Sequence, residues 1–283
     1  MTIENVSDTA RWVAVYRAME SARPDAIFRD PFAERLAGER GHQILDAMPK
    51  GRAFAWPMIV RTAVFDEIIL DAVQRRQADL VVNLAAGLDA RPWRLPLPPS
   101  LHWVDVDLPA ILNHKTDMLR DETPKCIYEA VTLDLREVQK RQALFALLGT
   151  GSKRALVIAE GLLVYLAPEE VAALATDLHS QPSFQEWLID LASPQLIKRM
   201  SRTWGKNVAA GGAPFRFAPE EGTEFFRPYG WREAVFRSTW EESQRLKRTM
   251  KGAWLWNLIG KLSSKKGKEK FRRFSGYVLL ERE

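Results

Sequence analysis

The sequence predicts an α/β fold in which helices cover both faces of a largely parallel β-sheet. Short apolar runs rich in Val, Leu and Ile are separated by stretches of helical character, and most of them end at a glycine or polar residue. Parallel strands are buried on both faces, so they appear as continuous apolar segments, and helices usually connect them. In such sheets, ligands bind beyond the carboxyl ends of the strands.

Two segments are predicted to be helices and six to be strands. The helices are Ser7–Arg17, which Ser7 or Asp8 can cap, and Thr62–Arg75, whose apolar residues share one broad face. Pro24 and Pro31 interrupt the chain between them. The predicted strands are Ala78–Leu84, Leu101–Val106, Ala155–Ala159, Trp187–Leu191, Ala234–Trp240 and Gly276–Leu280, of which the last two are expected to form an antiparallel pair.

Length and composition are those of a globular chain with one large domain. The 283 residues are 46% hydrophobic and 27% charged, and no apolar run approaches 18 residues. The single cysteine, Cys126, excludes a disulfide framework and a cysteine-rich metal site. Because the N-terminus also lacks a signal-peptide pattern, we expect a cytoplasmic protein.

The net charge of +5 comes from one C-terminal segment. Residues 245–273 contain eleven Lys and Arg but one acid, Glu269, for a local net charge of +10. The remaining chain has 30 basic and 35 acidic residues. The overall charge is therefore no argument for nucleic-acid binding by the whole protein.

A turn rich in small residues follows the first predicted strand, at Asn83–Asp89 (NLAAGLD). Small residues allow a tight turn and bring backbone N–H groups close to a ligand. A dinucleotide-binding turn has the pattern G-x-G-x-x-G before a helix, whereas this turn has one glycine and continues as Arg91-Pro92-Trp93. The sequence thus disfavours a nicotinamide-dependent dehydrogenase.

The second predicted strand ends in Val104–Asp107 (VDVD). An acid at this position can hold the two hydroxyls of a ribose through charge-assisted hydrogen bonds. Side chains alternate along a strand, so Asp105 and Asp107 share a face and the pattern does not choose between them. Both can equally be ordinary solvated residues at a strand end.

Two further acids occupy comparable positions, Asp134 in Thr132–Arg136 (TLDLR) and Glu160 directly after the third predicted strand. A carboxylate beside a free backbone N–H can recognise adenine, but Asp134 can also simply pair with Arg136. Glu160 can attract an ammonium or sulfonium group, or can be a glutamate at a helix N-terminus that the macrodipole favours.

Taken in chain order, these segments resemble class I S-adenosylmethionine-dependent methyltransferases of the leucine carboxyl methyltransferase family, and more closely their bacterial O-methyltransferase branch. The resemblance covers roughly residues 7–166. Its segments are SDTA at 7–10, YRAME at 16–20, FRDPFA at 28–33, RT at 61–62, NLAAGLDARPWRL at 83–95, VDVDLP at 104–109 with Lys115, DLR at 134–136 and EGLLVYL at 160–166.

The resemblance implies a Rossmann-like class I methyltransferase sheet with a helical N-terminal cap and an antiparallel C-terminal strand pair. It implies S-adenosylmethionine as cofactor and no metal. We expect a single domain, 1–283, with four parts: a helical cap region at 1–76, a cofactor-binding core at 77–192, a cap insertion at 193–232, and terminal strands with the basic segment at 233–283.

The resemblance also assigns roles to residues around the methionine part of the cofactor. Arg61 would bind its carboxylate, Gly87 would let the backbone approach it, and Glu160 would lie near its amino group. Tyr165 would face the reacting methyl group as the catalytic residue.

The resemblance assigns the nucleoside part to three other residues. Asp107 would bind the ribose hydroxyls, and Asp134 with the backbone of Leu135 would hold the adenine. One departure concerns the turn itself, since the family commonly has Leu-Gly-x-Gly where Ala85 replaces the first glycine. Alanine disfavours a positive φ, so a slightly reshaped loop is expected.

The expected activity is O-methylation of a carboxylate or phenol of a small molecule, a carboxylate before a phenol. Such acceptors are already ionised at pH 7 or need only modest help, and the matching segments contain no histidine and no lysine other than Lys115. Arg11, Arg17 and Arg202 are candidates to recognise the acidic oxygen.

Two alternatives stay open at this stage. One is methylation of a protein's C-terminal carboxylate, and the other is a non-catalytic binding module that uses the basic C-terminal segment. Met250–Leu262 has an apolar side flanked by lysines, which suits either an amphipathic helix on an anionic membrane or a helix packed on the core. We expect the packed helix, no nucleic-acid partner and no stable membrane association.

Overall fold

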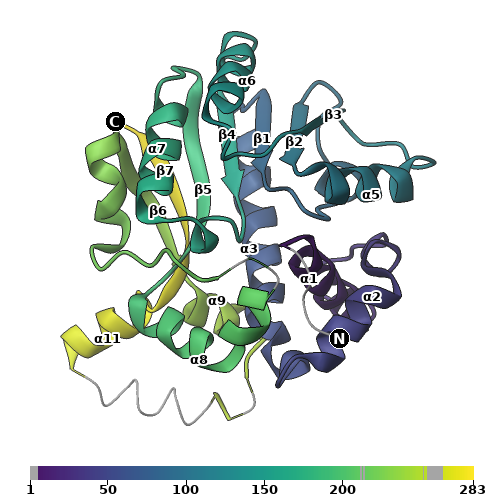
Figure 1. Ribbon diagram of the computed structural model, residues 1–283, viewed down its shortest axis with the longest axis vertical. Coiled ribbons are helices and arrows are strands. Elements are labelled where there is room, and N and C mark those ends of the chain that lie inside the picture. Colours follow the sequence, from purple (N-terminus) through teal and green to yellow (C-terminus); the bar gives the residue numbers. More distant parts are fainter. Residues whose placement is uncertain (1–5, 211, 213, 251, 254–263) are drawn as a thin grey trace.

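The computed structural model describes residues 6–210, 212, 214–250, 252–253 and 264–283. Within them, seven strands form one sheet in the order β3-β2-β1-β4-β5-β7-β6 (Figure 1). β1 to β5 pair in parallel, and β7 is antiparallel to both β5 and β6. The strands are β1 (Leu80–Leu84), β2 (His102–Asp107), β3 (Ile127–Thr132), β4 (Ala155–Ala159), β5 (Phe184–Ala192), β6 (Trp231–Ser238) and β7 (Ser275–Arg282).

Helices precede the sheet and connect its strands. Pro109 and Pro168 begin two of them, at the position where the fixed φ of proline suits a helix and its missing N–H costs nothing. The α-helices are α1 (Val6–Ser21), α2 (Ala33–Ala47), α3 (Ala55–Gln74), α4 (Arg91–Arg94), α5 (Pro109–Leu119), α6 (Val138–Thr150), α7 (Pro168–His179), α8 (Pro194–Ala210), α9 (Thr239–Arg245) and α11 (Lys265–Arg272). Short 3₁₀ helices are η1 (Gly51–Phe54), η2 (Leu163–Tyr165) and η3 (Gly222–Tyr229).

The sheet has a hydrophobic core on each face because alternate strand residues point in opposite directions. On one face, Val82 and Val157 pack with residues of α6, α7 and η3. On the other face, Val81 and Leu156 pack against α3. Thirteen of the twenty α3 residues are buried, which explains why this helix is apolar on much of its circumference.

The predicted α/β fold with its antiparallel C-terminal strand pair is confirmed. All six predicted strands are present, and the predicted helices correspond to α1 and α3. Ala234–Trp240 is shifted, since the strand begins at Trp231 and residues 239–240 already belong to α9. The helix suggested for Met250–Leu262 lies mostly outside the described residues.

β3 is not among the six strands predicted from the sequence. In the part of the chain that the structure describes, β3 is an edge strand that pairs only with β2, and its residues are exposed or half-buried. Its sequence, IYEAVT, is therefore not the continuous apolar run that marks a strand buried on both faces. Ile127, with 56% of its surface exposed, illustrates the difference.

The N-terminal helices and α8 lie at the end of the sheet toward which the arrows of β4 and β5 point (Figure 1). Aromatic contacts join them, with ring centroids 5.9 Å apart for Trp12 and Trp204 and 4.6 Å apart for Phe54 and Trp204. α8, within the expected cap insertion, and the N-terminal region thus pack together beyond the strand ends.

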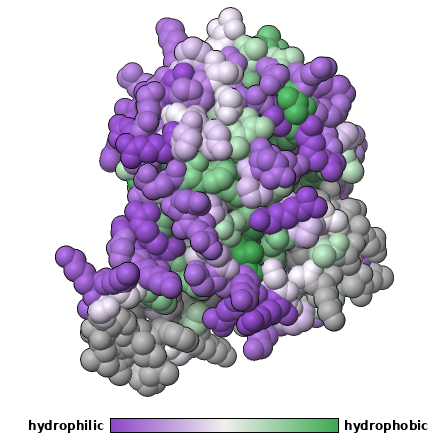
Figure 2. Space-filling model, turned by 60° about the vertical axis from the view of Figure 1, so that its left-hand side comes forward, coloured by the Kyte–Doolittle hydropathy of each residue, from purple (hydrophilic) through white to green (hydrophobic). Residues whose placement is uncertain are grey.

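Hydrophilic residues cover most of the face shown in Figure 2, and hydrophobic residues occupy smaller areas between them. None of the helices in the described part of the chain combines the length and the apolar character needed to cross a membrane.

Candidate active site

The turn after β1 is tied to the end of β2 by a single carboxylate. Asp107 Oδ2 accepts a hydrogen bond of 2.6 Å from the backbone N–H of Gly87, and its Oδ1 accepts one of 2.7 Å from Leu108. Gly87 has a φ of +54°, and a Cβ on it would lie 3.1 Å from the Cβ of Ala10 in α1. Glycine is therefore favoured at residue 87 both by the positive φ and by the close approach of α1.

The structure distinguishes the two aspartates of β2. Asp105 is fully buried and accepts hydrogen bonds from Lys115 Nζ at 2.6 Å and from Asn83 Nδ2 and Trp103 Nε1 at 2.9 Å each. Its role is structural, because these donors satisfy a buried charge. Asp107 stands at the strand end and is only partly enclosed. Burial raises its pKa against the opposing effect of the two backbone donors.

Alanine does not avoid a positive φ in this turn. Ala85 has a φ of +51°, so it adopts the left-handed conformation that a glycine would adopt. For an L-residue this conformation costs roughly 1–2 kcal/mol. The turn therefore keeps a glycine-like backbone at Ala85, at the expense of local strain.

Arg61 lies where α3 passes the carboxyl ends of β4 and β5. Its Nε donates to Glu160 Oε1 at 2.9 Å, and its Nη1 donates to Asp190 Oδ2 at 3.1 Å. The side chain is 9% exposed, and among the described residues its Nη2 has no hydrogen-bond partner. Although burial opposes the charge, Glu160 and Asp190 outweigh it and raise the pKa of Arg61.

A second arginine joins Glu160 to the β1 turn. Arg91 in α4 donates to Glu160 Oε2 at 2.8 Å, to Asp89 Oδ2 at 2.6 Å and to Asp66 Oδ1 at 2.7 Å. Asp66 also accepts two bonds of 2.7 Å from Arg94. Burial opposes ionisation of Asp89, but Arg91 and neighbouring cations lower its pKa to about 2.

These charges form one strand-end network with three guanidinium groups and four carboxylates, and thus a net charge of −1. Its members are Arg61, Asp66, Asp89, Arg91, Arg94, Glu160 and Asp190. Buried charges are stable only when they are paired and hydrogen-bonded, and each member has at least one partner within the network.

Asp134 lies after β3 and pairs with Arg136. Both of its carboxylate oxygens accept bonds from the Arg136 guanidinium, at 2.7 to 3.2 Å, and Oδ1 also accepts the Arg136 backbone N–H at 3.0 Å. These bonds with Arg136 lower the pKa of Asp134. The carbonyl of Leu135 accepts a bond of 2.6 Å from Arg141. The pairing considered as the alternative in the sequence is therefore present.

Tyr165 in η2 lies at the same end of the sheet as Arg61. Its ring stacks on Phe215 with centroids 5.8 Å apart, and its hydroxyl forms a hydrogen bond with the Thr9 side chain. Burial raises the pKa of Tyr165 to about 12. Its hydroxyl is thus protonated near neutral pH and can donate a hydrogen bond but not act as a base.

Two of the three cap arginines suggested for acceptor recognition make contacts within the protein. Arg17 donates to Asp30 at 2.8 Å and to the Leu88 carbonyl at 2.5 Å, and Arg11 contacts His114 at 3.0 Å. Arg17 therefore fixes α1 to the β1 turn. Arg202 is exposed on α8.

Sequence reasoning missed two members of the strand-end network that contact Arg61 or Glu160. Asp190 lies inside the predicted strand Trp187–Leu191 and is followed by Leu191 and Ala192, so it lacks the strand-end signal that identified Glu160. Arg91 was noted as evidence against a pyrophosphate-binding turn and as part of the resembling segment at 83–95, without a role of its own. Its contacts with Asp66 and Glu160 join residues 25 and 69 positions away, and no local pattern encodes them.

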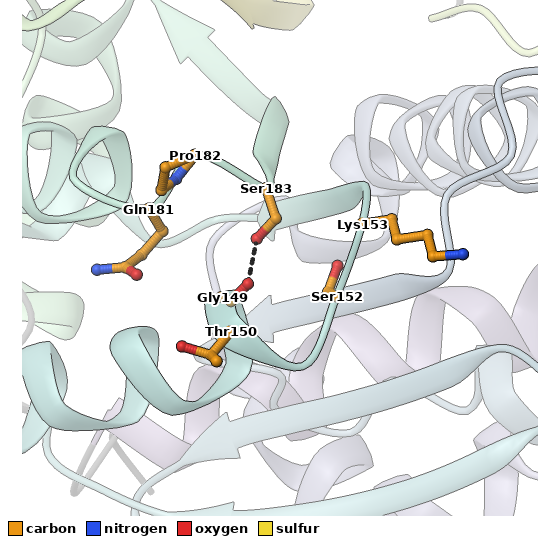
Figure 3. A pocket seen from close by; sticks show the side chains of 7 residues that line it. All are labelled: Gly149, Thr150, Ser152, Lys153, Gln181, Pro182 and Ser183. Carbon is orange, nitrogen blue, oxygen red and sulfur yellow. Dashed lines mark hydrogen bonds between the residues drawn. The ribbon is translucent and has the colours of Figure 1, made fainter.

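The two described surface pockets lie away from these strand ends. One, of about 360 Å³, lies at the amino ends of β4 and β5, where Ser183 donates a hydrogen bond of 2.8 Å to the Gly149 carbonyl (Figure 3). The other lies between α3 and the β6–β7 pair. Within the described residues, no group of three or more His, Cys, Asp or Glu side chains is placed to hold a metal ion.

Comparison with known proteins supports the fold and gives the family. A relative from Mycolicibacterium smegmatis is 35% identical over 192 residues, which are 62% of this chain and 63% of the relative. A relative from Streptomyces coelicolor is 31% identical over 79% of this chain and 82% of its own length. Both are named as S-adenosyl-L-methionine-dependent methyltransferases. The chain spans about three fifths of the length of several curated relatives that it matches.

Two solved structures have the same fold. A DUF574 family protein from Streptomyces avermitilis gives a TM-score of 0.61 at 12% identity, with 96% of this chain and 97% of that chain covered. A methyltransferase from Thermobifida fusca gives 0.60 at 14% identity, with 96% and 94% covered. The family model of leucine carboxyl methyltransferase matches residues 10–179, which is more than half of the chain. The chain therefore belongs to the leucine carboxyl methyltransferase family.

Proposed function

We propose that this protein is an S-adenosylmethionine-dependent O-methyltransferase that acts on a carboxylate or phenol of a small molecule. The observation that carries the proposal is the paired arrangement at the strand ends. Asp107 and the Gly87 turn are joined at β1 and β2, and Arg61 with Glu160 lies beside them. The carboxylate of Asp107 can accept hydrogen bonds from two hydroxyls, and the guanidinium of Arg61 and the carboxylate of Glu160 lie next to it. This combination of groups matches a ribose that bears an amino acid.

The side chains present fit this cofactor in charge and in hydrogen-bonding capacity. Arg61 keeps Nη2 without a hydrogen-bond partner in the described part of the chain, and a guanidinium edge suits a carboxylate. Each oxygen of Asp107 accepts one backbone bond and retains further lone pairs for hydroxyl donors. The net charge of −1 on the strand-end network also suits a cofactor with a net charge of +1.

Each predicted residue then has a role. Arg61 would bind the methionine carboxylate and Glu160 would lie near the amino group, while Gly87 supplies the close backbone approach. Asp107 would bind the ribose hydroxyls.

The remaining two roles concern the adenine and the reacting centre. Asp134 with the backbone of Leu135 would bind the adenine, which requires Asp134 to share its oxygens with Arg136. Tyr165, protonated at neutral pH, would donate a hydrogen bond at the reacting centre.

When bound, S-adenosylmethionine supplies a methyl group already activated by its sulfonium. The protein therefore has mainly to align the acceptor oxygen and exclude water. The cap formed by α1, α2 and α8 is suited to this task because it packs beyond the strand ends.

The acceptor is expected to be acidic because, within the described residues, the candidate site contains no histidine and no unpaired lysine that could serve as a base for an aliphatic alcohol. Lys115, the one lysine of the family segments, is fully buried and ion-paired with Asp105. An aliphatic alcohol would need a base within about 2.6–3.2 Å of its proton. A carboxylate is already ionised at pH 7, and a phenol with a pKa near 10 needs only modest help.

The test is to incubate the protein with methyl-labelled S-adenosylmethionine and a library of small acids and phenols, and to identify products by mass spectrometry. We expect a methyl ester or aryl ether, with kcat flat between about pH 6 and 8 under saturating acceptor. A methylated aliphatic alcohol or amine, with activity that follows a group of pKa near 7, would refute the proposal.

A further inference from the structure

Asp190 connects two parts of the candidate site that lie far apart in the sequence. Its Oδ1 accepts a hydrogen bond of 2.6 Å from the backbone N–H of Gly161, and its Oδ2 accepts one of 3.1 Å from Arg61 Nη1. It belongs to β5, whereas Gly161 follows β4 and Arg61 belongs to α3. One carboxylate thus fixes both the turn after β4 and the guanidinium beside it.

The turn at Gly161 is shaped to receive this guanidinium. Gly161 has a φ of +68°, and a Cβ on it would lie 3.0 Å from Arg61 Nη1 and 3.5 Å from Nη2. The absence of a side chain at Gly161 therefore leaves the space that the Arg61 guanidinium occupies. Arg61 donates from Nε to Glu160 and from Nη1 to Asp190. Among the described residues, its Nη2 atom therefore has no hydrogen-bond partner.

On the basis of the proposed function, we infer that Asp190 is a positioning residue for the amino-acid end of the cofactor. It holds the Arg61 guanidinium in the orientation that presents Nη2 to the cofactor carboxylate. Asp190 needs no contact with the cofactor for this role.

A carboxylate is needed at residue 190 because both of its partners are donors. An asparagine offers one oxygen and one NH₂ group, so it can accept from Gly161 or from Arg61, but not from both. Whichever way the amide turns, an N–H group then faces another N–H group. Asp190→Asn should therefore release either the turn or the guanidinium while it changes the side-chain volume very little.

The experiment compares two ligands by calorimetric titration of the wild type and Asp190→Asn. S-Adenosylhomocysteine has the amino-acid carboxylate, whereas 5′-methylthioadenosine has the same nucleoside without the amino acid. We expect Asp190→Asn to weaken S-adenosylhomocysteine about tenfold, the equivalent of one hydrogen bond to a charged group. We expect the affinity for 5′-methylthioadenosine to stay unchanged, a selectivity that general loss of structure would not produce.

Glu186→Gln is the matched control. Glu186 lies on the same strand, is 2% exposed, and accepts bonds of 2.5 Å from Arg76 and 3.0 Å from Arg154 at the opposite end. This change also replaces a buried, arginine-paired carboxylate by an amide, but it should leave the affinities for both ligands unchanged.

Each outcome bears on one claim. Equal loss of both ligands in Asp190→Asn, or no loss of either, would overturn the positioning role. If the wild type binds neither ligand, the proposed function fails instead. Should Asp190→Asn not fold, Arg61→Lys tests the same orientation, because lysine keeps the charge but lacks the planar fork. The same selective loss of S-adenosylhomocysteine is then expected, and equal or no loss overturns the inference.

Discussion

The two ends of the central sheet differ in what they present to a ligand. At the carboxyl ends, the strand-end network holds seven charged side chains in mutual contact, and Asp107 holds two backbone N–H groups. At the amino ends, a pocket of about 360 Å³ is lined by small or neutral residues and Lys153 (Figure 3). Of the two described pockets, the one at the strand ends thus lies at the amino ends, away from the strand-end network.

The candidate site is therefore assigned from the placement of charges and not from the shape of the surface. Paired charges are costly to bury, so a dense network of them is retained either for specificity of folding or for a ligand. Asp79 at the amino end instead uses its carboxylate for structure, since it accepts bonds from the backbone N–H groups of Lys153 and Arg154.

The largest expected effect comes from removing a cofactor contact at the carboxyl ends. Arg61→Ala and Asp107→Ala should each weaken S-adenosylmethionine binding roughly 10–150-fold, because a hydrogen bond to a charged group contributes about 1.5–3 kcal/mol. Calorimetry of folded variants measures this change. Lys153→Ala at the amino-end pocket is the control and should bind as the wild type does. Wild-type affinity in both strand-end variants would show that the cofactor contacts lie elsewhere. In the same assay, NADH should not bind to the wild-type protein.

A second effect concerns stability and its dependence on pH. The folded-state pKa of Asp89 is about 2, below its ordinary value of 3.8. Its contribution is therefore present above about pH 4 and is lost as the pH falls toward 2. Asp89→Asn should lower the free energy of unfolding at pH 7 by about 2 kcal/mol and flatten its pH dependence between about pH 4 and 2.

Asp79→Asn is the amino-end counterpart of this change. Burial opposes the ionisation of Asp79, but hydrogen bonds from neighbouring backbone N–H groups lower its pKa. Among the described residues, no guanidinium group contacts Asp79, so its substitution should cost less than that of Asp89. Urea unfolding at several pH values measures both. If Asp79→Asn lowers the free energy of unfolding as much as Asp89→Asn does, or more, the proposed difference between the two ends of the sheet is wrong.

A smaller effect is expected in the β1 turn. Ala85→Gly should raise the free energy of unfolding by up to about 1 kcal/mol, because the relief of a positive φ exceeds the entropy cost of glycine. Ala86→Gly is the control and should destabilise by roughly 0.5–1 kcal/mol, since Ala86 is not among the residues with positive φ. Thermal unfolding distinguishes the two. Destabilisation by Ala85→Gly would argue against the strained turn.

No effect is expected from the basic segment 245–273 on nucleic acid or membranes. Binding to DNA or to anionic vesicles should be absent over a range of salt concentrations, as measured by titration with light-scattering or fluorescence detection. A steep salt-dependent affinity for either would show that the segment has a function of its own.

The sequence predicts features that depend on local pattern. Buried strands appear as apolar runs, and the acids that follow them must meet at one edge because parallel strands share a direction. Asp107 and Glu160 could be located in this way. β3 was not predicted because the sequence of this edge strand is not a continuous apolar run. The choice between Asp105 and Asp107 required the structure, in which the fully buried Lys115 pairs with Asp105.

The contacts of the strand-end network depend instead on how distant segments cross. Arg61 meets Glu160 and Asp190 across 99 and 129 residues because α3 passes the ends of β4 and β5. No spacing within the sequence encodes such a pairing. The conformation of Ala85 also required the structure, since alanine alone indicates a negative φ.

A crystal structure of the protein with S-adenosylhomocysteine would test the central claim most directly. We predict ligand density at the carboxyl ends of the strands, with the ribose hydroxyls on Asp107 and the amino-acid carboxylate on Arg61. Density in the amino-end pocket lined by Gly149 and Ser183, or at neither end under saturating ligand, would contradict it.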